Sequence, residues 1–274
     1  VDSMKVMKNK VISVKDTARL AKRITWDLGG RSAIMKNDIM VLDLIANNNW
    51  ERPIYFAVTT GDDAYVGLKK YFQLEGLAYR FVPIKQTENE EALGGRVNTT
   101  AMYKNIMENF KWGGMDKKGV NLDENCVRMC GNLRMQMSIL ATALVEEGKN
   151  KKAKEVLDKC LQVMPDENIA FDATIFPICA TYYDIKETAK ANELAQKLFT
   201  IFEGDLRIYN AQKPNRMVAF AREKEQAKEI LKRLVSITAQ FKQEDLSKQF
   251  MQRLSAIVPA EELLPPQQQA PAGI

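Results

Sequence analysis

The segment from Met135 to Pro165 constrains the fold more than any other part of the chain, because its residues fit two antiparallel helices that cross closely. Small and apolar residues stand at helical spacing on both sides of a glycine: Leu140, Ala141 and Leu144 before Gly148, then Ala153, Leu157 and Cys160. Gly148 falls at the turn, and Pro165 closes the unit. We therefore predict a helix–turn–helix unit in which Ala153 is buried against Leu140 and Ala141.

This spacing resembles a tetratricopeptide repeat. A looser copy follows, with Cys179, Tyr182, Ala191, Ala195 and Leu198 in comparable positions. Lys186 replaces its turn glycine, and its offset from the first copy is 38 residues, longer than the usual ~34. Residues 219–241 and 245–257 would form a third pair. The sequence thus predicts an antiparallel helical-repeat array after residue 97.

The first part of the chain mixes two periods. Residues 11–14 are a short β-type run. Apolar residues at helical spacing predict a helix over 33–48, which Asn47, Asn48 and Asn49 would end because asparagine tolerates the left-handed conformation. The runs 54–60 and 77–84 are suited to buried strands, and 64–73 to a helix between them. We predict a βαβ unit with parallel strands and a right-handed connection.

These patterns divide the chain into three parts. Residues 1–97 form a small α/β subdomain, and its last residues, 85–97, are polar, contain glycine and lack a period, which is typical of a mobile linker. Residues 98–258 form the tetratricopeptide-like helical domain. Residues 259–274, with Pro265, Pro266 and three glutamines, are expected to be a disordered tail.

Composition excludes several classes of function. The net charge is only +5, and the 40 basic residues are interleaved with 35 acidic ones along the whole chain. Nucleic-acid binders concentrate their positive charge in one run or on one face, and no such run is visible in this sequence. The longest charge-free apolar stretch, 135–145, is far shorter than the ~20 residues that span a bilayer. No nucleic-acid partner is expected, and the chain itself reads as soluble.

Histidine is absent, which removes the commonest general base and most zinc geometries. Cys126 and Cys130 are four residues apart, but the chain lacks the second ligand pair that a zinc site needs. We therefore expect neither metal nor cofactor, and we interpret Cys126, Cys130, Cys160 and Cys179 as small buried apolar residues.

Two sequence words carry a resemblance to a known family: Trp50-Glu51-Arg52-Pro53-Ile54-Tyr55-Phe56 and Glu75-Gly76-Leu77-Ala78-Tyr79-Arg80. Residues 35–165 resemble the soluble C-terminal region of a multi-pass membrane family, common in Bacteroidetes and grouped with glycosyltransferases of the protein O-mannosyltransferase kind. The resemblance implies a place on the periplasmic face of the bacterial inner membrane. It also implies that catalysis belongs to a membrane part preceding Val1.

Three groups of residues are candidates for binding. Trp50 and Arg52 could stack on and hydrogen-bond a sugar, although a tryptophan at a helix–strand junction usually packs beneath the sheet. Thr60, Asp62 and Asp63 lie at the end of a predicted parallel strand, where α/β sheets bind ligands, although a strand end with a helix cap explains them as well. The third group is the face of the first repeat helix that would line a peptide groove: Met135, Ser138, Thr142 and Glu146.

Two main functions follow from these patterns. The first is a non-catalytic soluble domain that binds an acceptor or a partner, either a protein or peptide or the membrane portion of the same polypeptide. The alternative is a stand-alone enzyme that works through Thr60, Asp62 and Asp63 at the mouth of the βαβ unit. A purely structural adaptor is a third possibility.

Overall fold

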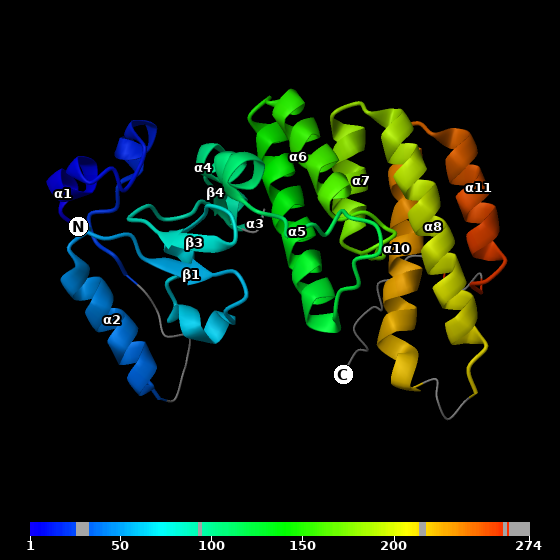
Figure 1. The fold of residues 1–274 in the computed structure, drawn as a ribbon, viewed down its shortest axis with the longest axis horizontal. Helices are drawn as coiled ribbons and strands as arrows, with labels where there is room; N and C mark the ends of the chain where they lie inside the picture. The colour runs from blue at the N-terminus through cyan, green and yellow to red at the C-terminus, as the bar shows by residue number, and fades with distance from the viewer. Residues whose placement is uncertain (26–32, 93–94, 214–217, 260–261, 263–274) are drawn as a thin grey trace, which may run out of the picture. The chain divides into compact units, whose positions relative to one another are not determined.

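The structure, a computed structural model, describes residues 1–25, 33–92, 95–213, 218–259 and 262. Its contacts group into two units (Figure 1): unit 1 is Val1–Gly113 with Ile139–Lys149, and unit 2 is Gly114–Ser138 with Asn150–Ile274. Helix α5 (Glu124–Glu146) contributes to both. Within the described ranges, no helix combines the length and the apolar character needed to cross a membrane. The predicted border after residue 97 stays a prediction.

Unit 1 combines short helices with a four-stranded mixed sheet. The strands are β1 (Tyr55–Ala57), β2 (Phe72–Leu74), β3 (Ala78–Phe81) and β4 (Arg96–Val97), in the spatial order β1-β3-β2-β4. The helical segments are α1 (Ser3–Lys8), η1 (Val14–Arg19), α2 (Lys36–Asn48), η2 (Asp62–Tyr65), η3 (Lys69–Tyr71), α3 (Glu88–Ala92), α4 (Thr99–Lys104) and η4 (Asn105–Asn109). Residues 11–13, expected as β-type, form no strand.

The predicted βαβ unit is wrong. β1 and β3 pair antiparallel, and β2, which the prediction assigned to a helix, lies between them in the chain and pairs antiparallel with β3. The helix 64–73 cannot form because Val66 (φ 51) and Gly67 (φ 69) are both left-handed, which breaks any right-handed helix. Gly76 sits in the β2–β3 turn with φ 137, a conformation that favours glycine.

Other N-terminal predictions are closer to the structure. α2 ends where expected, and its C-terminal cap Asn49 is left-handed (φ 54), as the asparagine argument requires. The segment 85–97, expected as a linker, contains α3 and strand β4, which pairs parallel with β2. A short strand paired at a sheet edge is a structured part of unit 1.

The sheet has two chemically different faces. Phe72 and Phe81 pack with Tyr65, Leu68 and Tyr71 in an aromatic core cluster on one face. The opposite face carries a single row of cross-strand partners, one from each strand: Tyr55, Arg80, Gln73 and Arg96. Directly paired side chains lie about 5 Å apart at Cβ, so these four polar groups are neighbours in space. This polar row is the element of the fold that positions the site described below.

Unit 2 is helical. After the first part of α5 it contains α6 (Asn150–Val163), α7 (Ile175–Asp184), α8 (Thr188–Asn210), η5 (Val218–Phe220), α10 (Ala221–Gln240) and α11 (Glu244–Ser255). α8 packs against α7 and α10, and α10 packs against α11 (Figure 1). The helices predicted at 219–241 and 245–257 are confirmed within a few residues. The residues predicted at close helix contacts are all fully buried: Ala153, Cys179, Tyr182, Ala191, Ala195 and Leu198 in unit 2, and Leu140 and Ala141 in the part of α5 that belongs to unit 1. The tetratricopeptide assignment itself stays a prediction.

The turns after α5, α7 and α10 share one geometry. Gly148 (φ 73), Lys186 (φ 65) and Lys242 (φ 58) are all left-handed. Each donates its N–H to the carbonyl three residues earlier, and the next residue donates to the carbonyl five residues before it, as from Glu187 to Tyr182. This pairing satisfies the last carbonyls of each helix. The absence of a turn glycine at 186 therefore does not abolish the turn.

We expect Lys186→Gly to stabilise unit 2. The left-handed conformation costs a non-glycine residue roughly 1–2 kcal/mol, and glycine avoids this cost. Glycine also gives the unfolded chain more conformational freedom, which offsets part of the stabilisation. The free energy of unfolding should therefore rise by about 0.5–1 kcal/mol, measured by urea denaturation followed by circular dichroism. Gly148→Ala, at the matching turn position in unit 1, should lower the free energy of unfolding of that unit. An unchanged or lower value for Lys186→Gly would contradict the shared turn geometry.

A buried arginine organises the α6–α7 connection. Arg134 on α5 is only 1% exposed and donates hydrogen bonds to three backbone oxygens: Met164 O (3.1 Å), Ile169 O (2.6 Å) and Ala170 O (3.0 Å). Burial lowers the pKa of its guanidinium, which the charge of Asp172 at 3.8 Å opposes. Its fork thus fixes a loop of unit 2 in which the carbonyls of Met164 and Ile169 would otherwise be buried without this donor.

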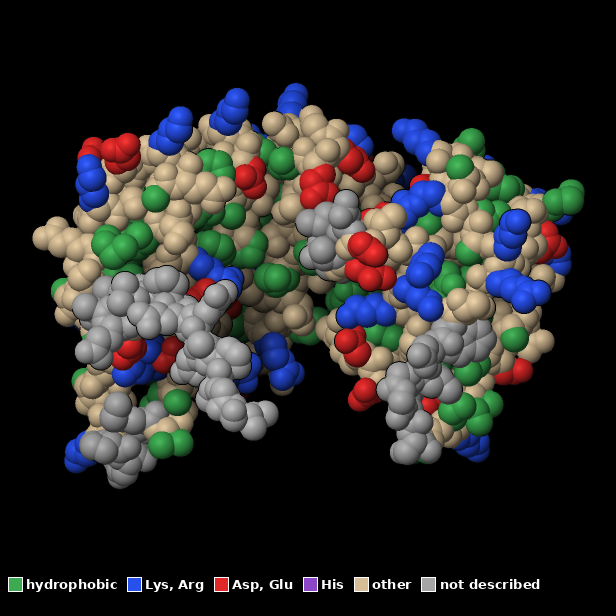
Figure 2. Space-filling view, turned by 180° about the vertical axis from the view of Figure 1, so that it is seen from behind, with side chains coloured by type: hydrophobic (Ala, Val, Ile, Leu, Met, Phe, Trp, Pro, Cys, Tyr) green, Lys and Arg blue, Asp and Glu red, His purple; other side chains and the backbone are tan. Residues whose placement is uncertain are grey.

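Three of the four cysteines are buried, and Asp123 caps the helix that carries two of them. Asp123 accepts from the N–H of Cys126 (2.8 Å) and so caps the start of α5. Cys130, Cys160 and Cys179 are buried as expected, whereas Cys126 is exposed because it lies on the outer face of the first turn of α5. Apart from Pro259 and Glu262, the predicted tail lies outside the described residues. On the helical part of the face in Figure 2, acidic and basic side chains are interspersed.

Candidate functional site

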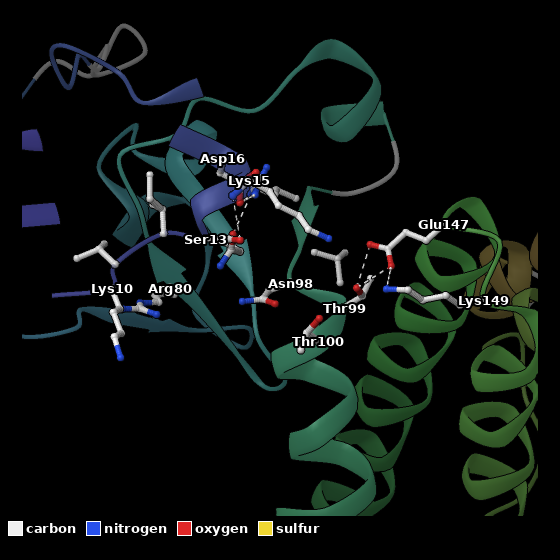
Figure 3. Close-up of a pocket in the computed structure, with 15 residues that line it drawn as sticks. Lys10, Ser13, Lys15, Asp16, Arg80, Asn98, Thr99, Thr100, Glu147 and Lys149 are labelled. Carbon is white, nitrogen blue, oxygen red and sulfur yellow. Dashed lines mark hydrogen bonds and ion pairs between the residues drawn. The ribbon is translucent and has the colours of Figure 1, made fainter. Parts of the chain in front are cut away.

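A large pocket lies on the polar face of the unit 1 sheet. It has a volume of about 810 Å³ and is lined by Lys10, Val11, Ile12, Ser13, Lys15, Asp16, Gln73, Arg80, Arg96, Val97, Asn98, Thr99, Thr100, Glu147 and Lys149. Figure 3 shows the labelled side chains around one space, with Glu147 and Lys149 at the end of α5 on one side. Small-molecule sites usually have volumes of about 300–1,000 Å³, so this pocket can hold a ligand of oligosaccharide or peptide-fragment size.

A hydrogen-bond network centred on Glu75 fixes Gln73 and Asn98, two polar residues that form the floor of the pocket. Glu75 is only 8% exposed. Its carboxylate accepts from Gln73 Nε2 (2.8 Å), Asn98 Nδ2 (3.1 Å) and Tyr55 Oη (2.9 Å). Gln73 in turn accepts from Arg96 Nε at 2.8 Å. Buried polar groups are costly unless paired, so this network fixes the amide and guanidinium groups in one arrangement.

Two arginines of the polar row are bonded very differently. Arg96 donates to Gln73 and forms ion pairs with Asp16 (2.6 Å) and Glu90 (3.3 Å), so its charge is compensated locally. The side chain of Arg80 is 19% exposed, yet within the described residues it has no hydrogen bond, and its Nε is buried without a partner. It forms an ion pair with Glu75, but at the long distance of 3.8 Å. Arg80 is therefore an incompletely bonded cation of the pocket.

Lysines and hydroxyl groups form the rim. Lys10 and Lys15 are exposed, and no acidic partner contacts them within the described part of the chain. On the opposite side, Thr99 donates to Glu147 (2.9 Å), which also pairs with Lys149 (2.5 Å). Ser13 and Thr100 add two further hydroxyls to the lining. The pocket thus combines a rigid polar floor, neutral donors and acceptors, and an excess of positive charge.

Glu90 holds the segment around the pocket through two arginines. Burial raises the pKa of its carboxyl, but hydrogen bonds from Arg19 and the Thr87 N–H, with the charges of Arg19 and Arg96, outweigh this and lower the pKa to about 2. The shortest of these contacts joins Arg19 Nη2 to Glu90 Oε2 at 2.6 Å. The ionised carboxylate therefore stabilises the folded form of unit 1.

We expect this contribution to depend on pH in a defined direction. Because the folded pKa is about 2 and the ordinary value is 4.5, the stabilisation is complete above pH 4.5 and is lost as the pH falls toward 2. The difference in unfolding free energy between the wild type and Glu90→Gln should shrink over this range. The measurement is urea denaturation followed by tryptophan fluorescence, with Glu88→Gln on the same helix as the control. A difference that does not change with pH would contradict this role.

The predicted pair Trp50 and Arg52 lies outside this pocket. The Trp50 ring stacks on Phe81 with centroids 5.5 Å apart, so one face of the ring is covered, as the packing alternative states. Both residues line a second, much smaller pocket of about 30 Å³, which also touches Arg80. Such a volume holds about one water molecule, and it is too small for a sugar ring.

Thr60, Asp62 and Asp63 line neither of these two pockets. Thr60 lies between β1 and η2, whereas Asp62 and Asp63 are the first residues of η2, where Asp62 forms a highly exposed ion pair with Lys69 at 3.1 Å. Because β1 belongs to an antiparallel pair, its end is not the ligand-binding edge of a parallel sheet. The stand-alone enzyme hypothesis therefore loses the geometry on which it depended. Across the described chain, no group of three or more Cys, Asp or Glu side chains could hold a metal ion.

The predicted helix face is only partly accessible. Met135 and Glu146 are exposed and Thr142 is half-buried, but Ser138 is 2% exposed and donates to the Met135 carbonyl at 2.8 Å. A groove lining needs its central residue at the surface. This face remains a candidate only at its two ends.

The prediction missed the residues that build the pocket. Glu75 and Arg80 stand in one of the two words that carry the family resemblance, but neither was assigned a role. The available signal was the pattern of β2 and the residue after it, where Gln73 and Glu75 alternate with Phe72 and Leu74. Polar residues on one face of a short strand usually face solvent, and here that face carries the buried network of the pocket.

Comparisons with known proteins address the same part of the chain. No curated protein and no solved structure matched. One family model matched, over residues 1–101. Thirteen of the fifteen lining residues, all except Glu147 and Lys149, fall within that range. The matching model is described as TMEM260-associated domain 2, so the part of the chain that builds most of the pocket is similar to a domain of TMEM260-like proteins.

Proposed function

We propose that this chain is the non-catalytic region of a TMEM260-like membrane protein that lies outside the bilayer and binds the acceptor, or the glycan on it, in the unit 1 pocket. The pocket carries the proposal, because it is large, polar and built almost wholly by the residues that match the family model. The glycosyltransferase role of the parent, and a place on the periplasmic face of the inner membrane, rest on the sequence resemblance.

The chemistry of the pocket supports binding rather than catalysis. Its acidic lining residues, Asp16 and Glu147, are both paired, with Arg96 and Lys149 respectively. A general acid or base needs a group that is free to exchange a proton with the substrate. Amides, hydroxyls and cations, by contrast, are the groups that recognise hydroxyl-rich ligands through hydrogen bonds.

A pair of bulky substitutions tests this proposal. Thr100 is exposed at the rim, so Thr100→Trp should fill part of the pocket, whereas Thr59→Trp adds the same ring to an exposed turn outside it. Binding would be measured on an array of Ser/Thr-containing peptides, plain and O-glycosylated. We expect the wild type and Thr59→Trp to bind the same members and Thr100→Trp to lose them. Equal binding by both variants, or none by the wild type, would contradict the proposal.

A further inference from the structure

We infer that the pocket takes a saccharide bearing an anionic group, a phosphate or a carboxylate, and that Arg80 binds this group; the inference rests on the proposed binding function. Arg80 lines the pocket, is four-fifths buried and donates no hydrogen bond to the protein within the described residues. A guanidinium carries five donors and binds carboxylate and phosphate through paired hydrogen bonds. Arg80 thus offers the geometry that an anion needs.

Arg96 shows that the fold can saturate an arginine at this sheet. It stands two strands away in the same row, with Asp16, Glu90 and Gln73 around it. Glu75, the acid nearest to Arg80, is instead engaged by Tyr55, Gln73 and Asn98 and keeps only a 3.8 Å contact with Arg80. A hydrogen bond requires a shorter distance, so the terminal amino groups of Arg80, unlike its buried Nε, remain available to a ligand.

The surroundings of Arg80 favour an anion on a hydroxyl-rich body. Lys10 and Lys15 add two exposed positive charges to the rim. These charges attract an anion over distances shorter than the Debye length, which decreases as the salt concentration rises. Ser13, Asn98 and Thr100 offer donors and acceptors suited to sugar hydroxyls. The volume of about 810 Å³ exceeds what a lone phosphate needs. Charge and volume together therefore indicate an anionic saccharide.

Isothermal titration calorimetry of the full chain at low and high salt tests the inference. The four probes are glucose 6-phosphate, glucuronate, glucose and inorganic phosphate. We expect at least one of the two anionic sugars to bind at least tenfold more tightly than glucose and than inorganic phosphate, and more weakly at high salt. Tighter binding of glucose 6-phosphate indicates a phosphate ligand, and tighter binding of glucuronate indicates a carboxylate ligand. Arg80→Gln should weaken that binding at least tenfold, and Arg23→Gln, an exposed arginine outside the pocket, should not.

Lys15→Gln provides a second variant, since it alters only the exposed rim of the pocket. If Arg80→Gln fails to fold, an affinity of Lys15→Gln for the anionic sugar that is at least threefold weaker than that of the wild type supports the inference. An unchanged affinity of Lys15→Gln overturns it. Equal binding of glucose and the anionic sugars, or of inorganic phosphate and the anionic sugars, would overturn it as well. If no probe binds but the peptide array still depends on Thr100, the anion inference fails and the proposed function stands. If Thr100→Trp also has no effect, both fail.

Discussion

Arg134→Ala should lower the free energy of unfolding of unit 2 by about 4 kcal/mol, one of the largest effects expected of a single substitution in this chain. The substitution leaves the buried carbonyls of Met164 and Ile169 without the donor that now satisfies them, and it also removes the part-buried bond to Ala170 O. Each unsatisfied buried group costs about 1–3 kcal/mol, and the cavity left by the side chain adds to this. Relaxation of the loop toward water would recover part of the loss.

Circular dichroism in urea measures this effect, because unit 2 supplies most of the helices. The matched control is Arg128→Ala on the same helix, where the side chain is exposed and donates to Asn125 Oδ1 at 2.9 Å. An exposed substitution of this kind should change stability by less than about 0.5 kcal/mol. If Arg134→Ala and Arg128→Ala destabilise equally, the buried fork does not hold the α6–α7 connection.

Glu75→Leu should destabilise unit 1 by about 3–5 kcal/mol, because it removes the acceptor shared by Tyr55, Gln73 and Asn98 and the counter-charge of Arg80. Removing one member of a buried ionic network leaves the charges and donors of the other members without a partner. The resulting loss of stability is larger than the net stabilisation that the intact network contributes. The same change should also disorder the pocket floor and reduce ligand binding.

Tryptophan fluorescence reports selectively on this effect, since Trp26, Trp50 and Trp112 all belong to unit 1 by sequence. Trp50 stacks on Phe81 in the strand next to the network, so its emission should follow unfolding there. Glu51→Leu is the control, because Glu51 is exposed and lies outside the large pocket. Unfolding curves for Glu75→Leu that overlay those of Glu51→Leu would show that Glu75 is not the centre of the network.

The helical part of the fold was largely predictable from sequence. Helix spacing, small residues at crossings and turn positions are local signals, and they placed the helix pairs α7–α8 and α10–α11 and the turn at Gly148. The asparagines after α2 likewise predicted its end correctly. Local backbone preferences decide these features, so a single sequence carries them.

The sheet was not predictable in the same way. Strand direction depends on which segments pair, and β2 was hidden in a run that reads equally well as a helix. The decisive residues were Val66 and Gly67, whose left-handed conformations break that run. A left-handed valine is rare, because its branched side chain crowds the backbone, so tertiary packing overrides the local preference here.

The candidate site could not be predicted because it joins distant segments. Residues 10–16, 73–80, 96–100 and 147–149 meet only once the strand order is known. Nothing in the local sequence predicts that Arg80 and Arg96 are bonded differently, since both are arginines in short strands. The difference lies in their partners, and partners follow from the tertiary structure.

Mapping the backbone amide chemical shifts of the full chain on addition of glucose 6-phosphate and of glucuronate, by NMR, tests the central claim most directly. If the unit 1 pocket is the binding site for an anionic saccharide, the largest shifts induced by whichever of them binds will cluster at Ser13–Asp16, around Arg80 and at Arg96–Thr100. Arg80→Gln will abolish them at the same ligand concentration. Shifts concentrated on the helices of unit 2, or an unchanged spectrum at saturating concentrations of both ligands, would contradict the claim.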